Sequence, residues 1–200
     1  MTRIETVCSN RPRAGGAAWL RRLAALLFAL ACALGPPPHA RAQEVELSTF
    51  EVTRTDESVL LTFTIRYDLP RSVEDALQKG VPLYFVAEAD VYRSRWYWRD
   101  PRVARASRTW RLAWQPLTRS YRVSFGGLSQ NFDTLGDAMT AVRGVARWKI
   151  ADSAQLEEGA RHYVEFRYRL DTSQLPRPMQ IGLVGQSDWT LAIEHSARID

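Results

Sequence analysis

Cysteine is missing from residues 43–200. Both cysteines of the 200-residue chain, Cys8 and Cys32, lie within the first 42 residues. Disulfide scaffolds, thiol redox centres, cysteine nucleophiles and cysteine-ligated metal sites all need a cysteine side chain. The absence therefore excludes these classes of protein for the region 43–200.

A net charge is also missing from this region. The whole chain has a formal net charge of +5, but its first 42 residues carry six Arg and one Glu. The remaining 158 residues hold 21 basic and 21 acidic side chains, so they are formally neutral. Proteins that bind nucleic acids rely on an excess of positive charge to neutralise phosphates. We therefore expect no nucleic-acid partner.

Long hydrophobic runs are scarce. Leu23–Leu34 is an uncharged run of twelve residues, whereas a transmembrane helix needs about 20. Arginines precede this run, Gly35–Pro38 breaks any helix after it, and Ala40-Arg41-Ala42 offers the small residues that a signal peptidase reads. The pattern predicts a secretory signal peptide over residues 1–42, cleavage near Ala42-Gln43 and a periplasmic or exported protein. An uncleaved signal that anchors the chain in the inner membrane is the alternative.

Residues 43–200 are expected to form a single domain rich in β-strands. Apolar and polar residues alternate strictly over three stretches, 59–68, 161–170 and 189–196. Such alternation is typical of strands with one buried face and one solvated face. A further strand over 45–54 changes phase, which predicts a β-bulge near Ser48-Thr49 and a hairpin into the second strand.

Two short helices are predicted, over 72–80 with Ser72 as N-cap and over 134–144. Additional strands are expected near 82–97, 103–115, 120–126 and 146–150. The sequence thus predicts a mainly β fold, an antiparallel β-sandwich that is immunoglobulin-like in architecture, with about seven to eight strands and two short helices. An open β-barrel is the alternative.

Residues 91–125, called here the Arg/Trp stretch, have an unusual composition. They hold nine Arg and a single acid, Asp100, together with four of the six Trp of residues 43–200. A hairpin that pairs Gln115 with Ser120 places six apolar side chains on one face and Arg111 and Arg122 on the other. One register of the preceding turn sets Arg95 opposite Arg105. Like charges directly opposed destabilise a strand pair, so an anion or an acid from elsewhere must compensate them.

The Arg/Trp stretch supplies the candidate site. Guanidinium groups bind carboxylates and phosphates in a bidentate manner and stack on aromatic rings. We therefore expect an anion-binding or partner-binding face for a glycan, a lipid headgroup or an acidic protein patch, made of Arg93, Arg95, Arg105, Arg111, Arg122, Trp96 and Trp98. The alternative is a solvated strand face whose arginines pair with acids of the same fold, such as Glu88, Asp90, Glu165 and Asp171.

Catalytic motifs are weak. His162 and His195 lie on the apolar side of their strands and lack a metal-ligand spacing, and Gly126–Asn131 lacks the second glycine of a nucleophile elbow and is predicted to be a loop. We therefore expect no enzyme, no cofactor and no metal. A hydrolase of envelope polymers, built on two carboxylates, and a carrier of an apolar ligand remain as alternatives.

Two blocks of the sequence resemble a known family. They are Trp96-Tyr97-Trp98-Arg99-Asp100 and the segment from Asp171 to Pro178. With their flanks they make residues 44–197 similar to the bacterial domain-of-unknown-function family 4390, small exported proteins found mainly in proteobacteria. The family label brings no reaction, cofactor or catalytic residue to carry over to this sequence. Its genes often neighbour those of a two-component sensor kinase of the nitrogen-regulation type.

The resemblance therefore implies an exported, periplasmic, non-enzymatic binding or accessory protein, associated with an envelope sensor-kinase system. Its expected partner is an envelope protein or an anionic envelope component, and peripheral membrane association belongs to the same expectation.

Overall fold

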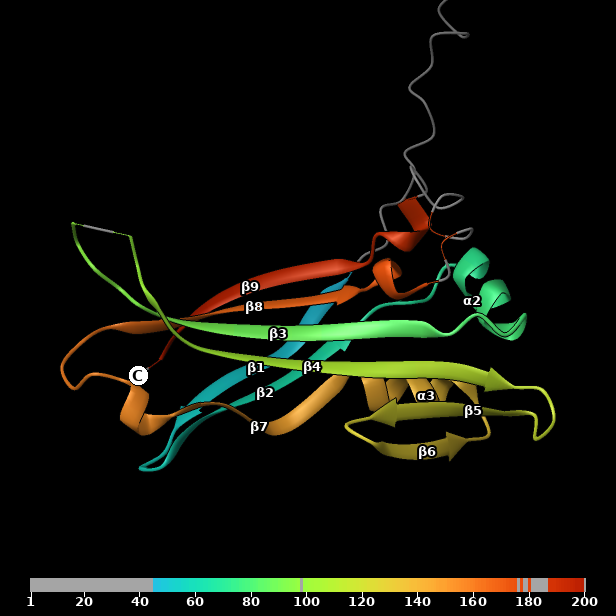
Figure 1. Cartoon of the computed structure of the whole chain (residues 1–200), viewed down its shortest axis with the longest axis horizontal. Coiled ribbons are helices and arrows are strands. Elements are labelled where there is room, and N and C mark those ends of the chain that lie inside the picture. Colours follow the sequence, from blue (N-terminus) through green and yellow to red (C-terminus); the bar gives the residue numbers. More distant parts are fainter. Residues whose placement is uncertain (1–44, 98, 176, 178–179, 181–186, 200) are drawn as a thin grey trace, which may run out of the picture. The chain divides into compact units, whose positions relative to one another are not determined.

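The computed structural model describes residues 45–97, 99–175, 177, 180 and 187–199, and residues 42–200 make up one compact unit. The predicted signal peptide, 1–42, lies outside the described residues. Nine strands and two α-helices occur in the described part of the chain, and the strands form two antiparallel sheets (Figure 1). The predicted antiparallel sandwich is confirmed. The open barrel is not adopted, because no described strand of one sheet pairs with a strand of the other.

The small sheet has the order β1-β2-β7, with β1 at Glu46–Arg54, β2 at Ser58–Arg66 and β7 at Gly144–Asp152. The register shifts between Leu47 and Thr49, so the predicted bulge is present. The Ser48 hydroxyl donates to the carbonyl of Thr64 across 3.0 Å. The bulge turns the apolar residues on either side of it toward the same core.

The large sheet has six strands in the order β6-β5-β4-β3-β8-β9. Their bounds are Leu83–Arg93 for β3, Arg102–Gln115 for β4, Ser120–Phe125 for β5, Leu128–Phe132 for β6, His162–Leu170 for β8 and Ala192–Ile199 for β9. The β4–β5 register matches the predicted one, since Gln115 pairs with Ser120 and Trp110 with Phe125. The large sheet lies in front of the small sheet in Figure 1.

The core lies between the two sheets. The apolar positions of the alternating stretch that forms β2 and continues one residue past it are all buried: Val59, Leu61, Phe63, Ile65 and Tyr67. Across the core, the ring centroid of Phe63 lies 4.6 Å from that of Phe166 and 6.2 Å from that of Tyr168. Such tilted and edge-to-face ring pairs add stabilisation beyond the area they bury. The alternate residues of β2 and β8 are half-buried or exposed.

Helices α2 (Arg71–Gln78) and α3 (Leu135–Val142) flank the sheets. Thr134 caps α3 by accepting the amide of Asp137 at 3.1 Å, as predicted for a helix in this segment. The predicted cap of α2 is wrong: Pro70 occupies that position and makes no side-chain cap. The Ser72 hydroxyl instead donates to Asp188 at 2.8 Å. Three single-turn 3-10 helices complete the described elements, η1 (Ser153–Gln155), η2 (Thr172–Gln174) and η3 (Ser187–Trp189).

Two further strand predictions need correction. Leu128–Phe132, predicted to lie in a loop, forms strand β6 and pairs with β5. Gly126 and Gly127 have φ angles of 54° and 84°, so they form the two-residue hairpin turn that favours glycine at both positions. The last strand begins at Ala192 rather than at Trp189, which lies in η3.

Candidate functional site

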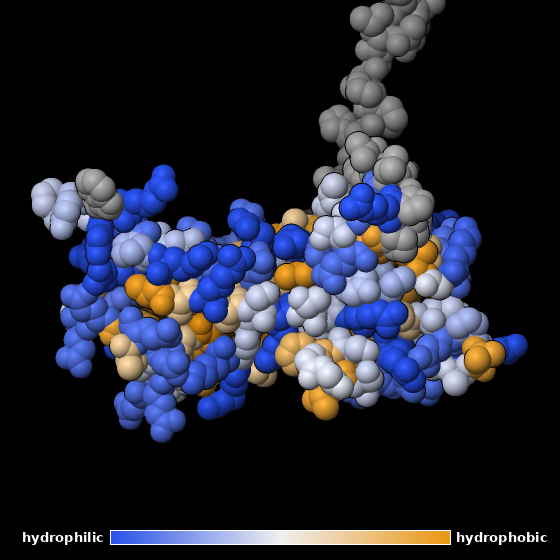
Figure 2. Space-filling model, in the orientation of Figure 1, coloured by the Kyte–Doolittle hydropathy of each residue, from blue (hydrophilic) through white to orange (hydrophobic). Residues whose placement is uncertain are grey.

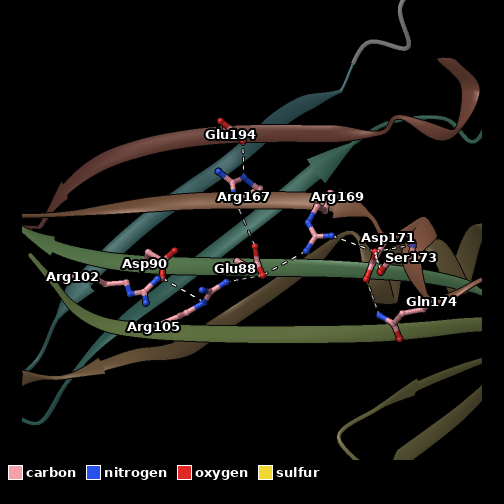
Figure 3. Close-up of polar contacts among 10 residues, drawn as sticks. All are labelled: Glu88, Asp90, Arg102, Arg105, Arg167, Arg169, Asp171, Ser173, Gln174 and Glu194. Carbon is pink, nitrogen blue, oxygen red and sulfur yellow. Dashed lines mark hydrogen bonds and ion pairs between the residues drawn. The ribbon is translucent and has the colours of Figure 1, made fainter. Parts of the chain in front are cut away.

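The outer face of the large sheet gathers charged side chains from four neighbouring strands. Strand alternation directs Glu88 and Asp90 of β3 away from the core, since the residues between and beside them are buried. The neighbouring outward positions belong to β4, β8 and β9, and Figure 3 shows the resulting network of Arg and acidic side chains. In Figure 2 this side of the molecule is largely hydrophilic, with small hydrophobic areas only.

Arg105 lies at the β4 side of this network. Its guanidinium is 3.0 Å from Glu88 Oε1 and 3.6 Å from Asp90 Oδ1. Arg102 adds a second contact to Asp90 at 3.4 Å. The register sets Arg105 directly opposite Asp90, so the register that would place Arg95 opposite Arg105, which the sequence left open, is not the one adopted. The charge of Arg105 is compensated by acids of the neighbouring strand rather than left for an external anion.

The β8 side of the network is built in the same way. Arg167 is 2.6 Å from Glu194 of β9, and Arg169 is 3.6 Å from Glu88 and 3.4 Å from Asp171. Partial burial raises the pKa of Asp171, but hydrogen bonds from Gln174 and Ser173 and the charge of Arg169 outweigh it, so the pKa is lowered. Asp171 therefore remains a carboxylate that holds the start of η2 against the sheet.

Most predicted site residues are compensated or lie apart from one another. Arg93 forms an ion pair with Glu157, and Arg122 donates to Asn131 at 3.0 Å. Arg111 lies on the outer face of β4, and its guanidinium has no hydrogen bond or ion pair within the described residues. The strand arginines of the Arg/Trp stretch thus do not form one continuous anion-binding face.

Arg108, also in the Arg/Trp stretch, points into the space between the sheets. Its guanidinium carbon lies 4.4 Å from the ring centroid of Phe125 and 5.5 Å from that of Trp148. Burial lowers its pKa from the ordinary value for arginine. Cation–π contacts on both rings offset part of the cost of burying the charge. Arg108 is therefore a structural residue.

The connection between β3 and β4, Ser94–Pro101, is called here the tip loop. In Figure 1 this green connection extends beyond the strands that it joins. Trp96 is 92% exposed and Tyr97 67% exposed, and their ring centroids lie 4.9 Å apart. The chain thus presents two large aromatic rings to solvent at the end of a long hairpin.

The base of the tip loop is fixed by hydrogen bonds. Asp100 accepts the amide of Arg95 through Oδ1 at 2.7 Å and the hydroxyl of Tyr163 through Oδ2 at 3.0 Å. The amide of Arg93 donates to Pro101, and the amide of Ser94 donates to Arg161 of the neighbouring connection at 2.8 Å. These contacts hold both ends of the loop against the large sheet.

Within the described residues, the guanidinium groups of Arg95 and Arg99 have no hydrogen bond or ion pair. Both residues are exposed beside Trp96 and Tyr97. Trp98, also predicted as a site residue, lies outside the described residues. The sequence singled out Arg95 and Trp96, but it missed Tyr97 and the anchoring role of Asp100. The signal that could have identified Asp100 is its position as an isolated acid between Arg99 and Arg102.

Comparison with known proteins bears on this site. Residues 42–198 match the model of a family described as a domain of unknown function, DUF4390. The chain belongs to the DUF4390 family. The match covers the two sheets and the tip loop. No curated protein and no solved structure matches the chain significantly.

The histidines of this DUF4390 domain belong to no group of three His, Cys, Asp or Glu residues suited to a metal within the described part of the chain. His162 is buried with Nδ1 3.1 Å from the carbonyl of Ala160, and burial lowers its pKa. His195 is exposed at the rim of the core, 4.6 Å from the ring of Phe50.

A shallow groove of about 350 Å³ on the DUF4390 domain lies over β3, β8 and β9. Its charged lining consists of Glu88, Asp90, Glu165, Glu194 and Arg167. Glu88, Asp90 and Glu194 each contact an arginine, as described above. Glu165 lies directly opposite Asp90 and forms no ion pair within the described residues. These carboxylates mainly neutralise the arginines of the sheet.

Proposed function

We propose that this DUF4390 protein is an exported, non-enzymatic binding protein of the cell envelope, and that the tip loop is its docking element. One observation carries the proposal. Trp96 is 92% exposed, although Asp100 and Tyr163 hold the loop that presents it in a fixed position. Exposed large aromatic side chains are typical anchors of binding surfaces, where they enter a partner and leave water.

The charges of the domain support the same assignment. Acids of the fold compensate Arg102, Arg105, Arg167 and Arg169 on the strand face. Arg95 and Arg99, on the tip loop, have no such partner within the described residues. A ligand that carries negative charge would therefore find available guanidinium groups on the loop rather than on the outer strands.

Export and a sensor-kinase connection belong to the proposal as well. The basic, apolar and small-residue parts of residues 1–42 support secretion and cleavage near Ala42-Gln43. Within the described residues, no helix is long and apolar enough to cross a membrane. The association with a sensor kinase rests on the family resemblance alone.

The carrier alternative has little support from the core. The rings of Phe63, Phe166 and Tyr168 pack against one another between the sheets. An apolar ligand would have to separate these rings, with the loss of their mutual contacts. The hydrolase alternative would have to use carboxylates of the groove over β3 and β8, where arginines contact Glu88 and Asp90.

The proposal is tested by crosslinking from the tip loop in living cells. A photoreactive phenylalanine derivative replaces Tyr97, because it conserves a ring at a position that is already exposed. Leu117 is the matched control position, because it is a fully exposed apolar residue in the turn between β4 and β5. We expect a specific crosslinked product from position 97 and none from position 117.

Equal labelling from both positions would overturn the proposal, and so would the absence of any product from position 97, whether to protein or to lipid, in a protein that also fails to bind lipid vesicles. A second set of variants locates the binding surface. Arg95→Glu should abolish the product, whereas Arg111→Glu, on the strand face, should preserve it. Loss of the product with Arg111→Glu alone would place the docking surface on the sheet instead of the loop.

A further inference from the structure

The tip loop combines exposed aromatic rings, arginines that are unpaired within the described residues, and a fixed base. Resting on the proposed docking role of this loop, we infer that its partner is the surface of a lipid bilayer that contains anionic headgroups. The loop enters the interfacial region of the bilayer with Trp96 and Tyr97, while Arg95 and Arg99 contact lipid phosphates.

The geometry of the loop favours a bilayer over a folded protein. The connection is eight residues long, and its described parts, 94–97 and 99–101, lie past the ends of β3 and β4 (Figure 1). A stable protein interface usually involves about 20 to 30 residues on each side. The side chains below the loop are charged and already paired, Arg93 with Glu157 and Arg102 with Asp90, so they add little apolar contact area. A fluid bilayer surface accommodates a narrow convex loop without a complementary pocket.

The exposed rings have the chemistry of the membrane interface. Trp and Tyr combine an apolar ring with a polar N–H or O–H group, and both are enriched where headgroups meet acyl chains. Trp96 and Tyr97 contact each other in a T-shaped arrangement. They therefore form one compact aromatic pair that would enter the interface together.

The charge of the loop is directed outward. Asp100 is the only acid among residues 94–101. Both of its oxygens are used at the base of the loop, one by the amide of Arg95 and the other by the hydroxyl of Tyr163. The guanidinium groups of Arg95 and Arg99 have no acidic partner within the described residues. The loop thus presents positive charge toward a surface of lipid phosphates, which attracts arginine electrostatically.

The fixed base strengthens the same inference. A binding element that is ordered before it binds loses less conformational freedom on association. The hydrogen bonds of Asp100 and the amide of Ser94 hold both ends of the loop in the unbound protein. The aromatic pair is therefore kept in an exposed position.

Vesicle co-sedimentation tests the inference. The full 200-residue chain is expressed, and the protein that the cell processes from it is purified and mixed with vesicles. One set of vesicles is phosphatidylcholine alone and the other is an equal mixture of phosphatidylcholine and phosphatidylglycerol. We expect binding to the mixed vesicles that weakens as salt is raised, since exposed charges are screened. Replacing both arginines (Arg95→Ala with Arg99→Ala) should weaken binding about 25-fold, from about fivefold for each arginine near an anionic surface.

Trp96→Ala with Tyr97→Ala should reduce binding to mixed vesicles at least as strongly, because it removes the apolar contacts. The matched control is Leu117→Ala with Arg119→Ala, which removes from another turn an exposed apolar residue and an arginine that has no partner among the described residues. This control should bind like the wild type. Unchanged circular dichroism spectra and melting temperatures verify that the four exposed positions of the tip loop affect docking rather than folding.

Two results would overturn the bilayer inference. The first is equal sedimentation of the wild-type protein and the Trp96/Tyr97 variant with mixed vesicles. The second is a lack of wild-type binding to these vesicles. If position 97 nevertheless crosslinks to a single protein in cells, the docking role of the loop stands and its partner is that protein. If the wild-type protein does not bind vesicles and no crosslinked product forms from position 97, the docking role itself fails.

Discussion

The hydroxyl of Tyr163, on β8, donates a hydrogen bond to Asp100 Oδ2 across 3.0 Å. The ring of Tyr163 also stacks on that of Tyr92, with centroids 5.4 Å apart. Asp100 is 63 residues away in the sequence, at the end of the tip loop. One carboxylate therefore connects the loop that carries the proposed docking residues to a strand in the interior of the large sheet.

This hydrogen bond predicts that the hydroxyl of Tyr163 ionises only at high pH. Partial burial, followed by the hydrogen bond and charge of Asp100, raises its pKa to about 12. Between the ordinary tyrosine pKa of about 10 and this value, the unfolded chain releases a proton that the folded protein retains. The contribution of Tyr163 to stability is therefore complete below about pH 10 and is lost as the pH rises toward about 12.

The measurement compares the wild type with Tyr163→Phe. Phenolate absorbance near 295 nm (an ordinary probe of tyrosine ionisation) should lack one late-titrating group in the variant. The free energy of unfolding should also decline less steeply from about pH 10 to about pH 12 in the variant. Identical titration curves for the two proteins would contradict the assigned hydrogen bond.

The buried pair of Tyr67 and Tyr168 predicts unequal effects of two similar substitutions. The Tyr168 hydroxyl donates to the carbonyl of Val142 at 3.0 Å, so it accepts the hydroxyl of Tyr67 at 2.9 Å. Tyr168→Phe leaves a buried donor and a buried acceptor without this partner, at a cost of about 1–3 kcal/mol. Tyr67→Phe keeps the bond to Val142 and should cost about 0.5–1.5 kcal/mol.

Urea denaturation at neutral pH measures both variants. Burial raises the pKa of both hydroxyls, so neither ionises under these conditions. The variants should unfold with the same dependence on urea concentration as the wild type, which shows that the comparison concerns stability and not compactness. A larger loss for Tyr67→Phe than for Tyr168→Phe would reverse the assigned donor direction.

Much of the sheet architecture was predictable because local alternation determines which face a side chain occupies. In the β4–β5 hairpin, alternation and a short turn were sufficient to pair Gln115 with Ser120 correctly. The same reasoning located the bulge at Ser48. Strand β6 was missed although Gly126-Gly127 is a recognised two-residue turn signal, because its residues are nearly all exposed and lack apolar alternation.

The compensation of Arg105 was harder to predict from sequence. The β3–β4 register depends on how many residues between the two strands are unpaired, and the tip loop contains eight such residues. Only this register places Arg105 opposite Asp90. The other ion pairs of the network join Arg167 of β8 to Glu194 of β9 and Arg169 of β8 to Glu88, and β8 and β9 follow β4 by dozens of residues. The acids Glu88 and Asp90 were correctly identified as alternative partners, whereas the role of Glu194 required the strand order.

Arg108 provides a prediction that separates a structural arginine from a binding one. Its planar guanidinium lies over the ring of Phe125 and near that of Trp148. Arg108→Lys keeps the charge but loses planar stacking, and it should lower the free energy of unfolding by about 0.5–2 kcal/mol. Arg119→Lys, in the exposed β4–β5 turn, should change it by less than about 0.5 kcal/mol. Equal stabilities of these two variants in thermal denaturation would contradict a structural role of the Arg108 guanidinium.

Neutralising two carboxylates of the large sheet, Glu165 and Glu194, should change the free energy of unfolding in opposite directions. Glu165 lies directly opposite Asp90 and lacks an ion pair within the described residues, so Glu165→Gln removes a repulsion and should stabilise the fold by about 0.2–1 kcal/mol. Glu194 contacts Arg167 at 2.6 Å, so Glu194→Gln should destabilise it by about 0.2–1 kcal/mol.

Both effects should shrink at high salt, because exposed charges are screened over about 10 Å at 0.1 M ionic strength. Chemical denaturation with urea, which adds no ions, measures both variants at low and high sodium chloride. Because the two substitutions change the net charge equally, a general charge effect would shift both stabilities in the same direction. Opposite signs therefore isolate the local pairing, and equal signs would show that the network in Figure 3 contributes nothing specific to stability.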